Sequence, residues 1–180
     1  MIIYKDIISG DELLADTFKI NEVDGVLWEA DCRKYTKNKN ESFELEGANP
    51  SAEGEDEDAA GGEGEQVMVH DIEDQFRLVW LKTEEGMKPS KDDFKSHLKS
   101  YIKKVNNKLK ETGASEETIK QFQSGAAGAM KKIIANYDNY DVMMGSSMDG
   151  SAMHVLIDFR EDGVTPYATL WKHGLTEYKV

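Results

Sequence analysis

The sequence lacks cysteine almost entirely, since Cys32 is the only one among its 180 residues. A disulfide within the chain is therefore excluded, and with it a small secreted fold held together by disulfides. Long apolar runs are also missing: no stretch approaches the roughly 20 residues of a membrane-spanning helix. The N-terminal stretch MIIYKDIISGDE carries a charge within five residues and has no signal-peptide core, so we expect a cytoplasmic protein without a membrane partner.

Catalytic and metal-binding motifs are absent from the sequence as well. It contains no GxxxxGK[ST], HExxH, GxSxG or paired CxxC motif. The four histidines are dispersed along the chain, so no zinc site is indicated; they are His70, His97, His154 and His173. We therefore predict that the protein is not an enzyme and has no obligatory cofactor. The net charge of −13 argues against a nucleic-acid partner.

Apolar residues recur at helical spacing over residues 90–137 and predict two helices folded back on each other. The apolar face of the first helix comprises Phe94, Leu98, Tyr101, Ile102, Val105 and Leu109. Ser90 suits the N-cap of this helix and Gly113 its end. Ser115 starts the second helix, whose apolar positions are Ile119, Phe122, Ala126, Met130, Ile133, Ile134 and Tyr137. The break at Gly113 and Ala114 is too short for anything but an antiparallel turn, so the segment is a helical hairpin.

The chain on both sides of the hairpin is typical of β-strands joined by short turns. Asp24-Gly25 and Asp162-Gly163 are hairpin turns with apolar runs on either side. We expect a brief turn or helix over residues 13–16, a strand over residues 76–81, and strand character at both ends of residues 33–45. About eight to ten strands around one helical hairpin indicate an α+β fold with a mostly antiparallel sheet, in a single domain over residues 1–180.

Residues 46–65 contain no aromatic residue, no β-branched residue and no positive charge. Such a segment buries too little apolar surface to offset its ordering entropy, so we predict a long mobile acidic loop. Its carboxylates suit weak calcium binding, although their spacing is not that of an EF-hand. The best ligand candidates are Glu53, Glu55, Asp56 and Asp58. The alternative is a solvated linker without a metal.

The first predicted helix carries a row of lysines that lie mainly off its apolar face. Four of them are candidates for a surface that docks acidic partners: Lys95, Lys99, Lys103 and Lys104. The same lysines also fit an ordinary solvated helix face, or attraction to the acidic segment of the same chain.

Four separated stretches make the sequence similar to a known family. Residues 45–54, LEGANPSAEG, resemble the first signature of the translationally controlled tumour protein family. The signature positions are Gly47, Asn49, Ser51, Glu53 and Gly54. The N-terminal MIIYKDIISGDELLAD, the hairpin phrase SGAAGAMKKIIANYDNY and residues 158–167, DFREDGVTPY, resemble other parts of that family in the same order.

The resemblance implies a β-tent of the Mss4-like fold with a projecting helical hairpin. It also implies partners: a Ras-family small GTPase, translation elongation factor one subunits, tubulin and anti-apoptotic proteins. Glu12 matches the position proposed to face the GTPase, whereas Ser146 stands where family members usually have an acid. The chain ends in Tyr-Lys-Val rather than in the cysteine of many animal members, and we expect a monomer.

The leading hypothesis is a regulatory adaptor, linked by the resemblance to growth control, stress survival, weak calcium binding and microtubule association. The alternative hypothesis is a regulator of a small GTPase, either by stimulating nucleotide exchange or by stabilising the nucleotide-free form. The third hypothesis is that the protein buffers calcium.

Overall fold

Every strand ladder in the part of the chain that the structure describes is antiparallel. The structure is a computed structural model that describes residues 1–38 and 66–180. These residues form two compact units, residues 1–32 with 72–180 and residues 33–71. The prediction of a single domain over residues 1–180 stays a prediction, and the predicted acidic loop lies outside the described residues.

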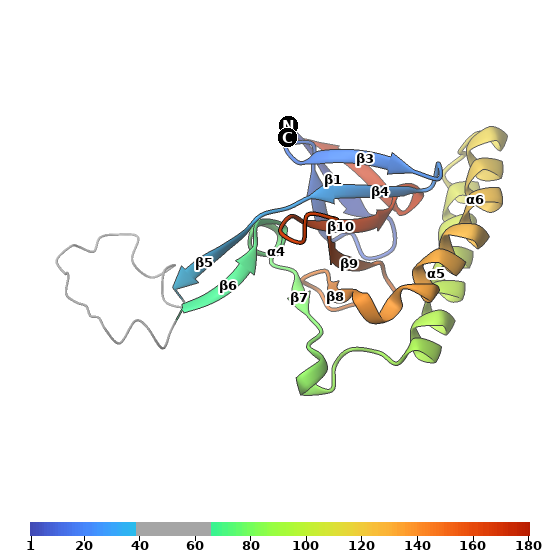
Figure 1. Ribbon diagram of the computed structural model, residues 1–180. Helices are drawn as coiled ribbons and strands as arrows, with labels where there is room; N and C mark the ends of the chain where they lie inside the picture. Colours follow the sequence, from blue (N-terminus) through green and yellow to red (C-terminus); the bar gives the residue numbers. More distant parts are fainter. Residues whose placement is uncertain (39–65) are drawn as a thin grey trace. The chain divides into compact units, whose positions relative to one another are not determined.

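Two sheets make up the body of the first unit (Figure 1). The six-stranded sheet has the order β3-β4-β10-β9-β8-β7, and the three-stranded sheet has the order β11-β1-β2. The strands are β1 (Ile2–Asp6), β2 (Glu12–Ala15), β3 (Lys19–Val23), β4 (Leu27–Asp31), β7 (Val79–Trp80), β8 (Asp141–Met144), β9 (His154–Phe159), β10 (Pro166–Trp171) and β11 (Leu175–Lys179). Together with the helical hairpin of residues 91–135, this arrangement confirms the predicted α+β class.

Both predicted Asp-Gly turns join antiparallel strands. Asp24 and Gly25 have φ values of 57° and 74° between β3 and β4, which only a residue tolerant of positive φ adopts readily. Between β9 and β10, the carboxylate of Asp162 accepts hydrogen bonds from the backbone N–H groups of Val164 and Thr165. The turn chemistry read from the sequence therefore sets the register of these two strand pairs.

The expectation of a brief turn or helix over residues 13–16 is wrong. Glu12–Ala15 is the strand β2, which pairs with β1. Leu13, Leu14 and Ala15 are all fully buried. Three successive buried side chains lack the alternation of a half-exposed strand, so the sequence pattern hid a segment whose two faces are both covered.

The predicted strand over residues 76–81 is wrong in most of its length. The chain forms the short helix α4 (Asp71–Phe76), and only Val79–Trp80 pair as β7. Arg77 has a φ of 56°, and the N–H of Leu78 bonds to the carbonyl of Glu73. A left-handed residue that closes a helix is a backbone event that the apolar run from Phe76 to Leu81 does not reveal.

The helical hairpin consists of α5 (Lys91–Glu111) and α6 (Glu116–Ala135). Ser90 and Ser115 cap the two helices, because their side chains accept hydrogen bonds from the N–H groups of Asp93 and Thr118. Gly113, at a φ of 76°, lies in the turn between them. The buried positions are Phe94, Leu98, Tyr101, Val105 and Leu109 on α5 and Phe122, Ala126, Ala129 and Ile133 on α6.

The buried face of the hairpin packs on one side of the sheets (Figure 1). Tyr101 lies so close to Gly174 that a Cβ on that glycine would be 2.0 Å from the tyrosine oxygen. The ring of Phe122 meets that of Trp171 edge to face at 6.3 Å. Gly125 of α6 approaches Val26, at the turn between β3 and β4. Each helix is therefore in contact with the rest of the first unit near the middle of its length.

The two ends of the hairpin are tied together by three contacts. The ammonium of Lys88 donates to the carbonyl of Tyr140 at 2.7 Å and lies 4.7 Å from the centre of the Tyr137 ring. The Tyr137 hydroxyl in turn donates to the carbonyl of Pro89 at 2.6 Å. This clasp, formed by Lys88, Pro89, Tyr137 and Tyr140, fixes where the chain leaves the sheet and where it returns.

The second unit contains the two-stranded ribbon of β5 (Lys34–Asn38) and β6 (Gln66–His70). Asp71 stabilises its base, because its carboxylate and N–H group both bond to the backbone of Arg33. The strand β5 agrees with strand character at the first end of residues 33–45; the other end lies outside the described residues.

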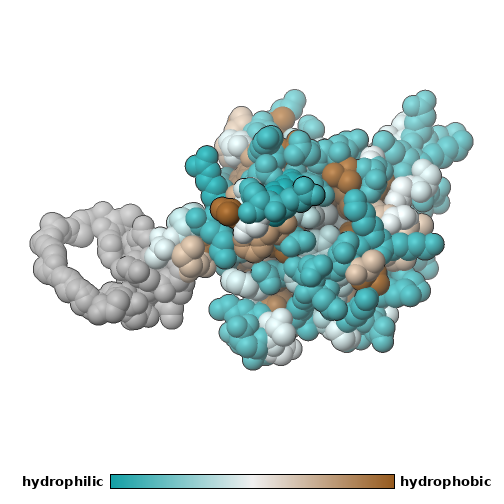
Figure 2. Space-filling model, in the orientation of Figure 1, coloured by the Kyte–Doolittle hydropathy of each residue, from teal (hydrophilic) through white to brown (hydrophobic). Residues whose placement is uncertain are grey.

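The face of the protein drawn in Figure 2 is mostly hydrophilic, with small and separate apolar patches. Some large apolar side chains are exposed over the described residues, as is usual for a protein surface. No helix in residues 1–38 and 66–180 has the length and apolar character needed to cross a bilayer.

Candidate functional site

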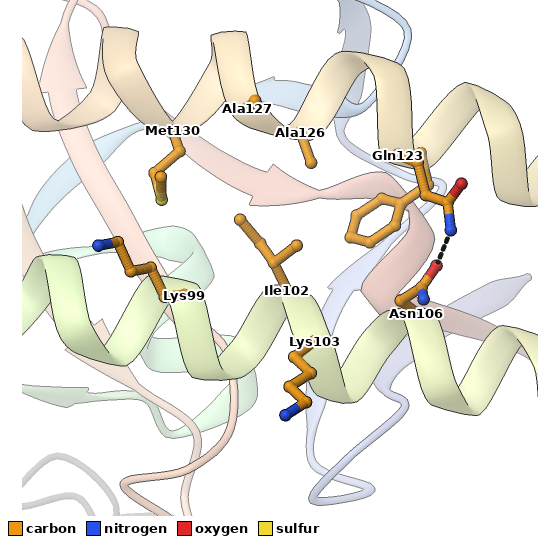
Figure 3. Close-up of a pocket in the computed structure, with 9 residues that line it drawn as sticks. Lys99, Ile102, Lys103, Asn106, Gln123, Ala126, Ala127 and Met130 are labelled. Atoms are coloured by element: carbon orange, nitrogen blue, oxygen red, sulfur yellow. Dashed lines mark hydrogen bonds between the residues drawn. The ribbon is translucent and has the colours of Figure 1, made fainter.

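A groove of about 340 Å³ lies between α5 and α6 on the hairpin (Figure 3). Its apolar lining comes from both helices: Ile102, Phe122, Ala126, Ala127 and Met130. One end carries a hydrogen bond between the helices, in which the amide of Gln123 donates to the side-chain oxygen of Asn106 at 3.0 Å. Lys99 and Lys103 of α5 complete the lining.

The groove exists because α6 presents alanines where larger side chains would meet α5. Ala126 is buried against the neighbouring helix and Ala127 is exposed beside it. Their methyl groups do not fill the space that Ile102 and Met130 leave open, and both of these side chains remain partly exposed. The result is a hollow with an apolar floor and a cationic side, a combination that suits an amphipathic anionic ligand or segment.

The four lysines predicted as a docking surface do not share one face of α5. Lys95, Lys99 and Lys103 are exposed and follow one another at intervals of four, which places them on one row. Lys104 is half-buried and about 100° further around the helix. Its charge lowers the pKa of Asp149 in the loop between β8 and β9, after the larger effect of hydrogen bonds from Ser151. The structure thus brings Lys99 and Lys103 to the groove and directs Lys104 elsewhere.

Glu12, the predicted GTPase-facing residue, is exposed at the start of β2. The neighbouring acid, Asp11, is engaged instead: its carboxylate accepts a hydrogen bond of 2.6 Å from the Ser147 hydroxyl. That carboxylate also packs against Gly145, where a Cβ would lie 2.4 Å from its oxygen. The contact ties the β1–β2 turn to the β8–β9 loop, so Glu12 stands on a fixed part of the surface.

A second acid, Asp6 at the end of β1, stabilises the β1–β2 turn. Asp6 is buried, and its carboxylate accepts hydrogen bonds from the N–H groups of Ile8 and Met153 at 2.8 and 2.7 Å. Burial raises the pKa of Asp6, while these N–H groups act in the opposite direction by stabilising the charged form. Asp6 therefore has a structural role in positioning the segment that carries Glu12.

The predicted calcium ligands Glu53, Glu55, Asp56 and Asp58 lie outside the described residues, as do the signature positions Gly47, Asn49, Ser51 and Gly54. Within residues 1–38 and 66–180, no three His, Cys, Asp or Glu side chains come together in a way that could hold a metal ion. Cys32 is buried, and its thiol donates to the carbonyl of Ala30.

Two features of the surface were missed by the sequence interpretation. The groove had a signal, the run of small residues SGAAGAM opposite Ile102, which indicates that α6 leaves space beside α5. The Asp11–Ser147 contact had none, because it joins residues far apart in the sequence whose types are common on any surface.

The fold and the surface together define an α+β protein with antiparallel sheets and a helical hairpin that carries a lysine-lined groove. A family model described as translationally controlled tumour protein matches residues 1–176. The chain belongs to the translationally controlled tumour protein family.

Relatives from several fungi agree with this assignment along their whole length. The translationally-controlled tumor protein homolog of Aspergillus fumigatus is 77% identical over 180 residues, and that of Saccharomyces cerevisiae is 41% identical, with 100% of each chain covered. The solved structure of the translationally controlled tumor-associated protein p23fyp from Schizosaccharomyces pombe is similar, with a TM-score of 0.77, 39% identity and 100% of both chains covered. A Caenorhabditis elegans structure of this family has a TM-score of 0.68 and 27% identity, covering 100% of this chain and 99% of the other.

Proposed function

We propose that this protein is a non-enzymatic regulatory adaptor that docks acidic segments of partner proteins on the hairpin groove. The observation that carries the proposal is the position of Lys99 and Lys103 beside an apolar hollow on the surface of a chain with a net charge of −13. Family membership supports partner classes that include translation elongation factor one subunits, tubulin and anti-apoptotic proteins. It also supports roles in growth control, stress survival and microtubule association.

The groove favours a partner that combines carboxylates with at least one apolar side chain. The apolar side chain would cover Ile102 and Met130, and the carboxylates would approach the two lysines. Exposed ion pairs contribute only about 0–1 kcal/mol each, so the lysines serve mainly to orient the partner and to speed its association. Binding should accordingly weaken as salt is raised.

The test uses two charge-matched double variants and subunits of translation elongation factor one as the partner, with affinity measured by calorimetry. Lys99→Glu with Lys103→Glu should weaken binding at least about tenfold, a loss of about 1.4 kcal/mol. Lys91→Glu with Lys110→Glu changes the net charge equally, but neither residue lines the groove, so this control should bind nearly as well as the wild type. Equal losses in both variants would show that the overall charge, and not the groove, decides binding.

The second candidate function is regulation of a small GTPase through Glu12. The exposure of Glu12, beside a turn fixed by Asp11 and Ser147, supports this proposal. A carboxylate there could compete for a lysine or for the magnesium region of the GTPase and so loosen nucleotide. Nucleotide-release kinetics test it: Glu12→Val should abolish any effect on the GTPase, and Ser146→Glu should strengthen it. Robust exchange by the wild type would favour this function over the adaptor.

We also propose that the acidic segment binds calcium weakly, through Glu53, Glu55, Asp56 and Asp58. The support is chemical, since carboxylate oxygens are the ligands that calcium prefers, and a site without EF-hand spacing belongs to the upper micromolar to millimolar class. Calcium titration of the wild type and of a variant with all four residues changed to the matching amides tests the assignment. Undiminished binding by that variant would place the site elsewhere.

A further inference from the structure

Two imidazole rings meet where α5 packs on the start of β9. His97 of α5 is partly buried, and His154, only 8% exposed, is the first residue of β9. Their ring centres are 4.1 Å apart with the planes at 62°. We use the name α5–β9 joint for this contact, which comprises residues 94–105 of α5 and residues 150–157.

The other rings at the joint are neutral and aromatic. Phe94 has its ring centre 5.9 Å from that of His97 and 6.0 Å from that of His154. Tyr101 stacks on His97 at 6.1 Å, and its buried hydroxyl has no hydrogen-bond partner among the described residues. The imidazoles therefore sit in a weakly polar pocket that favours their uncharged form.

The charged groups around the pair offer no compensation for a proton. Lys104, from α5 itself, is a cation that acts on His97. The carboxylates of the β8–β9 loop and of β1 are engaged with other groups: Asp149 bonds to Ser151, and Asp6 to the N–H groups of Ile8 and Met153. On α5 itself, Asp93 lies four residues before His97. Neither imidazole has an ion pair with a carboxylate in the described part of the chain. The loop contributes backbone hydrogen bonds, with Gly150 and Ala152 as acceptors; these raise the pKa of His97 but are outweighed by burial.

Burial, His154 and Lys104 together lower the pKa of His97 from 6.5 to about 4, and burial lowers that of His154 as well. A histidine whose folded-state pKa is depressed takes up its proton more readily once its surroundings open. The contact is thus fully stable above about pH 6.5 and loses stability as the pH falls from there towards about 4.

We propose that the α5–β9 joint is an acid-sensitive contact, in which protonation of His97 and His154 releases α5 from β9 while the sheets stay folded. The consequence is a hairpin whose attachment depends on pH and whose opening precedes global unfolding. The proposal concerns the contact between helix and sheet and does not depend on what the groove binds.

The expected size of the effect follows from the two pKa values of His97. Because the open joint binds a proton at about pH 6.5 and the closed joint at about pH 4, the opening constant should be about 30-fold larger at pH 5 than at pH 7.5. Amide exchange followed by mass spectrometry, corrected for the intrinsic effect of pH on exchange, should show this increase in residues 94–105 and 150–157. Strands β4 and β10 should show no comparable change.

Two histidine-to-phenylalanine variants locate the effect. His97→Phe keeps an aromatic ring without a titrating group and should remove most of the pH dependence at the joint. His173→Phe is the matched control, because His173 faces Gln121 and Phe122 of α6, and it should leave the response of α5 intact. A joint that opens equally at both pH values in the wild type, or equally steeply in His97→Phe, would overturn the proposal.

An NMR titration of the wild-type imidazoles gives a readout that needs no variant. His97 should remain neutral well below pH 6 in the folded protein. A pKa of His97 near 6.5 with the joint still closed would also overturn the proposal, whether or not the phenylalanine variants fold.

Discussion

The two glycines of α6 allow the same substitution to be tested with opposite outcomes in one helix. A Cβ on Gly128 would have no atom within 4 Å, whereas a Cβ on Gly125 would lie 2.7 Å from a methyl carbon of Val26 and 3.2 Å from the carbonyl oxygen of Asp24. Alanine within a helix is more stable than glycine by about 0.5–1 kcal/mol, and this gain applies to both positions.

Because Gly125 is in close contact with Val26, the substitution by alanine should lower the free energy of unfolding at this position instead of raising it. Overpacking a well-filled contact costs about 1–3 kcal/mol, which exceeds the helix-propensity gain. We expect Gly128→Ala to raise the free energy of unfolding by about 0.5–1 kcal/mol and Gly125→Ala to lower it by up to about 2 kcal/mol. In a protein of this size, each kcal/mol corresponds to a shift in Tm of about 2–4 °C.

Urea unfolding followed by circular dichroism measures both variants, with thermal melts as a second observable. Adding Val26→Ala to Gly125→Ala removes the clashing methyl groups, so the double variant should be more stable than the sum of the single effects predicts. Equal stabilisation by Gly125→Ala and Gly128→Ala would refute the packing of α6 against the β3–β4 turn.

Three further predictions address other parts of the fold. Leu98 and Ile133 are only 2% and 1% exposed, so Leu98→Ala and Ile133→Ala should each lower the free energy of unfolding by about 2–5 kcal/mol. Denaturant titrations measure this loss, and a loss below about 1 kcal/mol would mean that these side chains do not belong to the hydrophobic core. Tyr101→Phe removes a buried hydroxyl that has no partner among the described residues, so stability should be unchanged or rise by about 1 kcal/mol; a clear loss would reveal a hidden hydrogen bond. Ser147→Ala should cost about 0.5–1.5 kcal/mol and speed amide exchange in residues 145–151, with no change in α6, and unchanged exchange in that loop would show that the Asp11 contact does not hold it.

The parts of the fold that could be predicted from the sequence are those with a local physical signal. The hairpin was such a case, because apolar residues at helical spacing, Ser90, Ser115 and Gly113 all agree within one segment. Asp24-Gly25 was another, since positive φ at both positions is a property of those two residues themselves. By contrast, β2 is a strand only because β1 lies beside it, and nothing in Leu13 or Leu14 reports that neighbour.

The candidate site was predictable only in part for the same reason. The charge of Lys99 and Lys103 is a local property, but the hollow beside them depends on how α6 packs on α5. The separation of Lys104 from that row follows from helix geometry, whereas its interaction with Asp149 depends on where the β8–β9 loop lies. Prediction from sequence therefore identified the charged residues but not the surface that they form.

The clasp at the base of the hairpin has a consequence for how the chain folds. Strands β7 and β8 are neighbours in the sheet, yet the whole hairpin lies between them in the sequence. Closing a loop of that length by random search carries an entropic cost that grows as (3/2)RT ln n, about 0.6 kcal/mol for each doubling of the number of residues. Helices form within about a microsecond, long before a search of that kind is complete. Once α5 and α6 have formed and Lys88 and Tyr137 have joined their ends, the distant strands face each other across what is in effect a short connection, so a long-range pairing acquires the kinetics of a local one.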